Sequence, residues 1–386
     1  MSDTVADTEQ QAGAGTPRQP VRGSMADGRE ILYFFDASHR HGDFAAPADQ
    51  RTLPGRPPAA ELRRDALTGE WVSFAAHRQT RTHLPPADEC PLCASTADRS
   101  TEIAAADYDV VVFENRFPSF GPHQQDQVLG TGLGATFPAH GRCEVIAFGA
   151  AHDDSFGDLP VERARTVVDA WAQRTGELSA LPGIEQVFAF ENRGAQIGVT
   201  LHHPHGQIYS YPYIPPRTLA QLEQARNHRA GTGRNLMQDV LDFEIADGSR
   251  IVEHGEHFTV FVPFAARMPI EVHIVPNRHV ADLAGLTAAE RAELAEVYLR
   301  LIRGVDALYS TPTPYIAAWF QAPTRHPDAG ELRLHLQLTS PRRAEDKLKY
   351  LAGSEAAMGA FIGDVTPEST AARLRDAIQS VKGTPA

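Results

Sequence analysis

The strongest constraint on the fold is an internal duplication. Residues 144–148, followed by His152 and a helical stretch, are echoed by residues 271–275, His279 and a second helical stretch. The offset between matching residues stays near 130, and a repeat of about that length is a strand-helix-strand unit copied once. Two such units predict an α+β fold in which two antiparallel sheets, each a half-barrel with flanking helices, pack about a pseudo-twofold axis.

Amphipathic stretches at residues 161–178 and 287–308 carry the predicted helices of the two copies. Apolar residues recur in both at three- and four-residue spacing, which is the pattern of a helix with one buried face. We therefore expect a first domain at residues 61–216, and a second, degenerate copy of it at residues 217–386.

Residues 1–60 precede the repeat. The first 28 contain almost no large apolar residue, which predicts a disordered tail. Residues 31–35 form a short strand candidate, and a proline-rich stretch that reads as a linker follows them. The composition of this extension indicates no function.

The strand that ends the first copy carries alternating histidines, in the sequence HPHGQ at residues 203–207. Every second side chain of a strand points to one face, so His203, His205 and Gln207 point together. Imidazole can attack phosphorus and later leave it, and Gln207 can donate hydrogen bonds without supplying a proton. Gly206 removes a side chain that would keep a phosphate from the backbone. The cluster predicts phosphoryl or nucleotidyl transfer on His205.

A core histidine bonded to a backbone carbonyl is the commoner fate of an isolated one. Upstream, however, Asn192, Gly198 and Thr200 supply an amide, a hydroxyl and glycine-flanked N–H groups of the kind that cradle phosphate. The second copy keeps His335, but Gln337 stands where His205 stands in the first. We expect only the first copy to retain the nucleophile.

Cys90 and Cys93 form a C-x-x-C turn, whose geometry lets two thiolates reach one tetrahedral zinc. His203 is the best third ligand, and His152 follows an apolar strand from which a loop can bring it to the metal. A C-x-x-C pair alone also fits a redox pair. Four protein ligands leave no position for water, so the expected zinc is structural and holds the strand of His205.

Charge and cysteine content exclude several classes of protein. The net charge of -13 argues against broad contact with nucleic acid or anionic membrane, and leaves a metabolite-sized ligand. No apolar run is long enough to span a membrane, and the amino terminus lacks the features of a signal peptide, so we expect a cytoplasmic protein. Three cysteines do not suit a disulfide framework.

The order of several motifs resembles that of the galactose-1-phosphate uridylyltransferases, the transferase branch of the histidine-triad superfamily. The motifs are TGEWV at 68–72 with Arg78 and Arg81, CPLC at 90–93, FENRG at 190–194, HPHGQ at 203–207 and KYLAGSE at 349–355. The resemblance runs from about residue 62 to the carboxyl terminus, and the duplicated fold is the one that the family implies.

The resemblance implies a ping-pong reaction through a covalent intermediate. His205 would attack the α-phosphorus of UDP-glucose, which releases glucose 1-phosphate and leaves a uridylyl-histidine. Galactose 1-phosphate would then take the uridylyl group and leave as UDP-galactose. Gln207 would donate a hydrogen bond to a nonbridging phosphoryl oxygen.

The resemblance also implies a homodimer and assigns binding residues. Positions that match diphosphate contacts are Asn192, Gly198 and Thr200, and positions around the uridine are Phe113 and Asn115. Arg78 and Arg81 match arginines that in the family reach nucleotide phosphates across the dimer interface. Lys349, Gly353 and Glu355 match the family's sugar-binding block. The zinc ligands are matched by Cys90, Cys93, His152 and His203.

Two blocks depart from the family pattern. Some relatives hold a second metal with one glutamate and three histidines, and the matching positions here read Gln221, Phe320, His335 and Gln337. Two amides and a phenylalanine cannot replace such ligands, so we expect no second metal. In the sugar-binding block Ser354 replaces a tyrosine, which leaves the preferred hexose open.

Three other functions stay open. A histidine-triad hydrolase would use a third histidine to protonate its leaving group, which Gln207 cannot do. A nucleotidyl phosphorylase or transferase acting on another donor, such as ADP-glucose, would use the same nucleophile. A non-catalytic sugar-nucleotide binding protein would form no covalent adduct.

Overall fold

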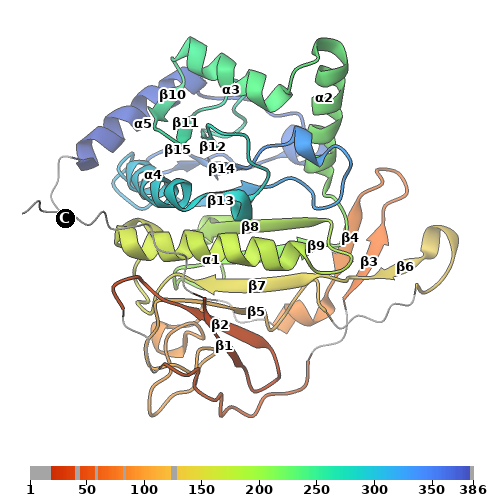
Figure 1. Ribbon diagram of the computed structural model, residues 1–386, viewed down its shortest axis with the longest axis vertical. Coiled ribbons are helices and arrows are strands. Elements are labelled where there is room, and N and C mark those ends of the chain that lie inside the picture. Colours follow the sequence, from red (N-terminus) through yellow and green to blue (C-terminus); the bar gives the residue numbers. More distant parts are fainter. Residues whose placement is uncertain (1–18, 40–43, 57–59, 81–83, 123–127, 383–386) are drawn as a thin grey trace, which may run out of the picture.

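The computed structural model describes residues 19–39, 44–56, 60–80, 84–122 and 128–382. Within these residues, one antiparallel sheet runs in the order β1-β2-β5-β7-β9-β8-β13-β14-β12-β11-β10 (Figure 1). Its strands are β1 (Val21–Ser24), β2 (Glu30–Phe34), β5 (Val110–Glu114), β7 (Arg142–Ala147), β8 (Gln186–Arg193), β9 (His205–Tyr211), β10 (Ile251–His254), β11 (Phe258–Phe261), β12 (Ile270–Pro276), β13 (Tyr315–Phe320) and β14 (His335–Ser340).

Smaller sheets and helices complete the described structure. Two short sheets consist of β3 (Glu61–Arg64), β4 (Trp71–Phe74) and β6 (Thr136–Pro138), and of β15 (Arg342–Ala344) and β16 (Lys347–Leu348). The α-helices are α1 (Val161–Ser179), α2 (Pro216–Thr232), α3 (Leu236–Asp247), α4 (Ala288–Asp306) and α5 (Pro367–Lys382).

The predicted α+β class and the duplication are confirmed. The first copy comprises β7, α1, β8 and β9, and the second comprises β12, α4, β13 and β14. Helices α1 and α4 lie side by side (Figure 1), and both pack into the main core with buried Trp171, Tyr298 and Trp319. At the start of α4, Thr287 and Glu290 form the reciprocal hydrogen bonds of a capping box, which fixes where the helix begins.

The two copies form one sheet, and the prediction of two separate sheets is wrong. Within the sheet, β8 is the outermost strand of the first copy, and it pairs with β13, the outermost strand of the second. An unpaired edge strand exposes a row of N–H and C=O groups, and joining the two edges satisfies both rows. Each face of the first copy therefore continues into the corresponding face of the second copy.

Strand position and hydrogen bonding correct the predicted match between the copies. His205 and His335 are each the first residue of their strand. Nδ1 of each ring lies beside the carbonyl oxygen two residues earlier, at 2.7 Å for His205 and 2.9 Å for His335. Gln207 and Gln337 each follow two residues later, so Gln337 is the counterpart of Gln207. His335, two residues earlier, is the counterpart of His205, so the expectation that Gln337 takes the place of His205 is wrong.

The amino-terminal segment contributes two strands to the main sheet. Strand β2 confirms the strand candidate at residues 31–35. Residues 21–24, expected within a disordered tail, form β1, which pairs with β2. Backbone pairing and the ion pairs of Arg22 with Glu30 and Glu177 hold β1 without large apolar side chains. Residues 1–18 of the predicted tail lie outside the described residues.

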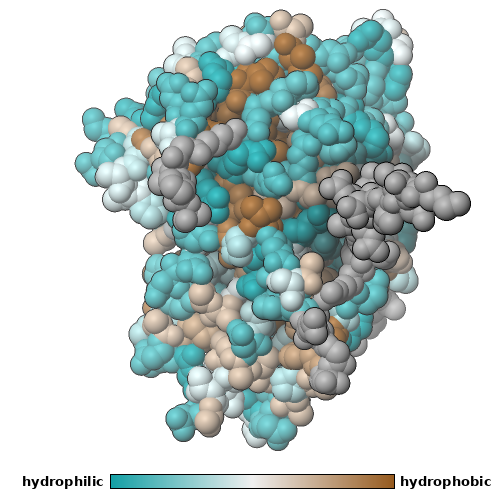
Figure 2. All heavy atoms as spheres, turned by 60° about the vertical axis from the view of Figure 1, so that its left-hand side comes forward, coloured by the Kyte–Doolittle hydropathy of each residue, from teal (hydrophilic) through white to brown (hydrophobic). Residues whose placement is uncertain are grey.

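The surface in Figure 2 is mostly hydrophilic, with hydrophobic groups gathered in its upper and central parts. Among the described residues, no helix combines the length and the apolar composition that crossing a bilayer requires.

A buried carboxyl group lies where the two copies meet. Glu191 on β8 accepts hydrogen bonds from the hydroxyls of Tyr298 on α4, at 2.9 Å, and Tyr315 on β13, at 2.7 Å. Arg193 and Asp306 are the nearby charges, and they pair with each other at 2.6 Å. Burial raises the pKa of Glu191 to about 7. The folded protein therefore holds a proton here that the unfolded chain loses at lower pH.

Replacing Glu191 with glutamine should change how stability depends on pH. Because the folded pKa exceeds the unfolded one, wild-type stability from this group is full below the unfolded pKa and falls as pH rises to about 7. The free energy of unfolding of Glu191→Gln, minus that of wild type, should increase by up to about 3 kcal/mol between about pH 5 and about pH 8. Urea unfolding at the two pH values measures this change. The exposed Glu256→Gln should gain nothing, and an equal difference for Glu191→Gln at both pH values would contradict this account.

Candidate active site

His205 is the first residue of β9 and lies where two cavities meet. One cavity has a volume of about 160 Å³, and its polar lining includes Arg78, Asn115 and Gln207. The other has a volume of about 430 Å³ and is lined by Asn192, among others. An imidazole at this junction can reach a ligand that extends from one cavity into the other.

The backbone fixes which nitrogen of His205 faces a ligand. Nδ1 lies 2.7 Å from the carbonyl oxygen of His203, so Nδ1 carries the proton and donates it to this hydrogen bond. Nε2 then keeps its lone pair. Burial lowers the pKa of His205, which favours the neutral, nucleophilic ring at neutral pH.

Tyr209 orients Gln207, although the sequence analysis did not select it. Its hydroxyl donates to Oε1 of Gln207 at 3.0 Å, and Arg78 donates to Tyr209 at 3.5 Å. With its oxygen engaged, the amide of Gln207 has its NH₂ group to offer to a ligand. Tyr209 shares the strand face of His205 and Gln207, so the alternation of β9 was the signal that could have found it.

Gly206 faces away from the cavities. A Cβ atom at this position would lie 2.9 Å from the carbonyl oxygen of Phe190 and 3.0 Å from the ring of Phe148. Close packing against the core therefore requires glycine here, rather than the approach of a phosphate that the sequence analysis expected.

The equivalent histidine of the second copy also lines a cavity, of about 140 Å³, but both of its ring nitrogens are hydrogen-bonded within the chain. His335 donates Nδ1–H to the carbonyl of Arg333 at 2.9 Å, as His205 does to His203. Its Nε2 accepts from Gln337 at 3.0 Å, and the ring of Phe320 stacks on it with centroids 5.2 Å apart. The lone pair that the first copy offers to a ligand is used internally in the second.

The smaller cavity combines apolar walls with polar groups. Phe113 is buried at the end of β5, and Asn115 follows the strand. The side-chain oxygen of Asn115 accepts from the backbone N–H of Phe117 at 2.8 Å. Thr200 also lines this cavity, together with Arg78, so Arg78 lies beside His205 of its own chain rather than reaching across a dimer interface. These four predicted residues therefore lie around the same space as His205 and Gln207, while Arg81 lies outside the described residues.

Asn192 and Gly198 sit differently. Asn192 is on β8 and lines the larger cavity together with His205. Gly198 ends a short 3₁₀ turn with a φ of 81°, in the left-handed region that favours glycine. Gly198 lines neither cavity. The structural role of Gly198 is therefore to turn the chain towards Thr200.

The carboxyl-terminal block lies apart from these cavities. Lys349 and Glu355 form an ion pair at 2.9 Å, and Gly353 begins the helical turn that carries Glu355. None of the three lines either cavity beside His205. Within the described part of one chain, the structure therefore does not bring this block to the candidate nucleophile.

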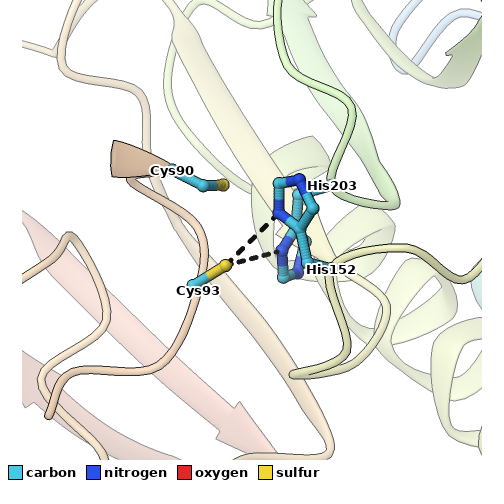
Figure 3. Close-up of side chains that lie close together, drawn as sticks. All are labelled: Cys90, Cys93, His152 and His203. Atoms are coloured by element: carbon cyan, nitrogen blue, oxygen red, sulfur yellow. Dashed lines mark hydrogen bonds between the residues drawn. The ribbon is translucent and has the colours of Figure 1, made fainter. Parts of the chain in front are cut away.

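Four predicted metal ligands come together behind the nucleophile. Their ligand atoms all lie within 4.8 Å of one another, and the residues are Cys90, Cys93, His152 and His203. Figure 3 shows the two cysteines facing the two imidazole rings. Sγ of Cys93 lies 3.4 Å from Nδ1 of His152 and 3.6 Å from Nδ1 of His203.

The donor set fits tetrahedral zinc. Bonds of about 2.3 Å to sulfur and about 2.1 Å to nitrogen, meeting at the tetrahedral angle, separate the two ligand atoms by about 3.6 Å. Nε2 of His203 donates to the carbonyl of Gly149 at 2.8 Å, which leaves Nδ1 unprotonated towards the cysteines. Burial raises the pKa of Cys90 to about 11, so a thiolate there needs a compensating cation.

Comparisons with known proteins cover most of the chain. The family model described as galactose-1-phosphate uridyl transferase, N-terminal domain, matches residues 56–215, and that of the C-terminal domain matches residues 221–383. A galactose-1-phosphate uridylyltransferase of Streptomyces lividans is 44% identical over 368 residues, which covers 91% of this chain and 96% of the relative.

Solved structures share the fold. One described as uridylyltransferase is 32% identical, with a TM-score of 0.73, and the match covers 83% of this chain and 99% of that one. An ADP-glucose phosphorylase from Arabidopsis thaliana is 21% identical, with a TM-score of 0.62, and the match covers 82% and 99%. At that identity the likeness concerns the fold alone.

Proposed function

Because the chain belongs to the galactose-1-phosphate uridylyltransferase family, we propose that it transfers UMP from UDP-glucose to galactose 1-phosphate through His205. The observation that carries this proposal is the hydrogen bond from Nδ1 of His205 to the carbonyl of His203, at 2.7 Å. It leaves Nε2 as the attacking atom at the junction of two cavities.

The reaction runs in two displacements. Nε2 of His205 forms a bond to the α-phosphorus while the bond from that phosphorus to the bridging oxygen breaks, and glucose 1-phosphate leaves with the electron pair. A phosphate oxygen of galactose 1-phosphate then attacks the same phosphorus, and Nε2 leaves with its electron pair. UDP-galactose is the product, and the neutral imidazole is restored.

Gln207 and the basic residues stabilise charge in this scheme. The NH₂ group of Gln207, oriented by Tyr209, donates to a nonbridging oxygen of the α-phosphate as charge develops on it. Arg78 lies in the same cavity as a cation for the nucleotide phosphates, and Asn192 offers an amide on the other side of His205. In this proposal Phe113 and Asn115, which line the same cavity, contact the uracil.

We propose a structural zinc ion held by Cys90, Cys93, His152 and His203. Bound zinc would cross-link the C-x-x-C turn, the segment between β7 and α1 that carries His152, and the turn before β9 that carries His203. It would supply no chemistry on the substrate. His203 also provides the carbonyl that accepts the hydrogen bond from Nδ1 of His205. A zinc-bound His203 would therefore hold the ring of His205 with Nε2 towards the cavities. No second metal is proposed at Gln221, Phe320, His335 and Gln337.

We further propose a cytoplasmic homodimer. The three predicted sugar-binding residues do not line the cavities beside His205 of the same chain, and a second copy would supply them. Tyr350 in this block and Met358 just after it are 74% and 81% exposed, and such apolar exposure suits an interface. The particle mass in solution measures the oligomeric state.

Incubation with UDP-glucose tests the proposed activity directly. Intact-mass measurement should show the mass of one uridylyl group added per chain, and peptide mapping should place it on His205. Galactose 1-phosphate should discharge the adduct, whereas ADP-glucose should form little of the corresponding adenylyl form. An adenylyl adduct discharged by inorganic phosphate would favour a phosphorylase instead, and no adduct with either donor would favour a binding protein.

A further inference from the structure

Glu102 lines the smaller cavity, together with His205, Phe113 and Asn115, and it has no role so far. Its residue is 8% exposed. Its backbone N–H donates to the carbonyl of Pro91, inside the C-x-x-C turn, at 3.0 Å. A carboxylate held this deeply is costly unless charged or hydrogen-bonding partners compensate it.

The partners come from the amino-terminal segment, defined here as residues 19–39 and 44–55. NH2 of Arg29 donates to Oε2 of Glu102 at 2.6 Å, and NH1 of Arg51 donates to Oε1 at 2.9 Å. Both arginines precede the family model, which starts at residue 56. A segment outside the family model therefore positions a side chain inside the cavity.

The charges around Glu102 leave it able to bind a further donor. Arg29 also pairs with Asp27 at 2.7 Å, and Arg51 also pairs with Asp49 at 2.7 Å. Arg116, which lines the cavity too, lies 3.7 Å from Oε1. Two carboxylate oxygens offer about four lone-pair sites, and two are used by the arginines of the amino-terminal segment.

The part of a nucleotide that matches this carboxylate is the ribose. Phosphate oxygens repel a carboxylate, and they belong near Arg78 and His205. Uracil presents one N–H between two carbonyl oxygens, which suits the NH₂ group of Asn115 better. The vicinal hydroxyls of ribose are neutral donors, and an acidic residue accepts from ribose hydroxyls in other nucleotide sites.

We infer that Glu102 accepts hydrogen bonds from the ribose hydroxyls of the bound uridine nucleotide, and that the amino-terminal segment belongs to the site because Arg29 and Arg51 position Glu102. This inference rests on the proposed function. It assigns a specificity role to Glu102 and a purpose to residues whose composition indicates none.

The test compares two donors on one enzyme, UDP-glucose and its 2′-deoxyuridine analogue. The measured quantity is the second-order rate constant for adduct formation on His205, obtained for each donor from single-turnover experiments at low donor concentration. Wild type should prefer the ribonucleotide roughly tenfold to a hundredfold, as expected for a hydrogen bond to a charged group. For Glu102→Gln the preference should fall to within about threefold. A ratio between donors is independent of the fraction of enzyme that is folded.

Glu114→Gln is the matched control. Glu114 is 3% exposed and pairs with Arg56 at 2.9 Å, but it does not line the cavity, so its donor preference should equal that of wild type. Arg51→Met should lower the preference by a smaller factor than Glu102→Gln, and it decides the matter if Glu102→Gln fails to fold.

The two levels of the proposal fail in different ways. A wild-type protein that forms no adduct from UDP-glucose would overturn the proposed function. Adduct formation by wild type, with the same donor preference in Glu102→Gln or, if that variant does not fold, in Arg51→Met, would overturn this inference alone.

Discussion

His205→Ala is expected to abolish the covalent adduct with UDP-glucose and to reduce exchange between UDP-glucose and galactose 1-phosphate by roughly 10⁴-fold or more. The variant removes Nε2, the atom that forms the bond to phosphorus. It also removes the hydrogen bond from Nδ1 to the carbonyl of His203. That carbonyl lies beside the cavities, where water can replace the lost donor, so the fold should persist.

Two measurements make this result decisive. Intact mass follows the adduct, and a radiolabelled sugar phosphate follows exchange. His254→Ala is the matched control, because His254 is exposed on β10, lines neither cavity beside His205 and should retain adduct formation. Activity of His205→Ala within tenfold of wild type would remove His205 as nucleophile.

Loss of the proposed zinc is expected to have the second largest effect. Stripping the metal with a chelator, or Cys93→Ser, should lower the melting temperature by roughly 10 °C or more, because metal binding is coupled to folding. Adduct formation should fall as well, since His203 is both a proposed ligand and the residue whose carbonyl orients His205.

Cys143→Ala is the control for the metal experiment. Cys143 is fully buried on β7 but lies outside the ligand cluster, so the variant should keep the metal and show only a packing loss. Metal analysis should find one zinc per chain. An unchanged melting temperature after complete chelation would disprove a structural zinc, and two metals per chain would disprove the predicted loss of the second site.

Patterns local in sequence were enough to predict much of the fold. The spacing of apolar residues predicted α1 and α4 to within two residues at each end, because a helix face buried against a sheet repeats every three or four residues. The joining of the two copies through β8 and β13 was not predictable in this way, because hydrogen bonds between edge strands leave no periodicity in either strand.

The match between the copies failed for a different reason. A shift of two residues along a strand keeps every side chain on its own face, so alternation alone cannot distinguish His335 from Gln337 as the counterpart of His205. Strand position and hydrogen bonding do distinguish them, because His205 and His335 each begin a strand and each place Nδ1 beside the carbonyl two residues earlier.

By itself, the sequence determined which chemistry the first copy can perform. Alternating His203, His205 and Gln207, with a C-x-x-C pair upstream, required no tertiary information, because strand alternation and ligand spacing are local. Tertiary structure alone decided which histidine is free to react. His205 opens onto two cavities, whereas His335 is capped by Gln337 and stacked on Phe320. It also brought Arg29 and Arg51 to Glu102 from 73 and 51 residues away, and contacts at such separations depend on packing rather than on any local pattern.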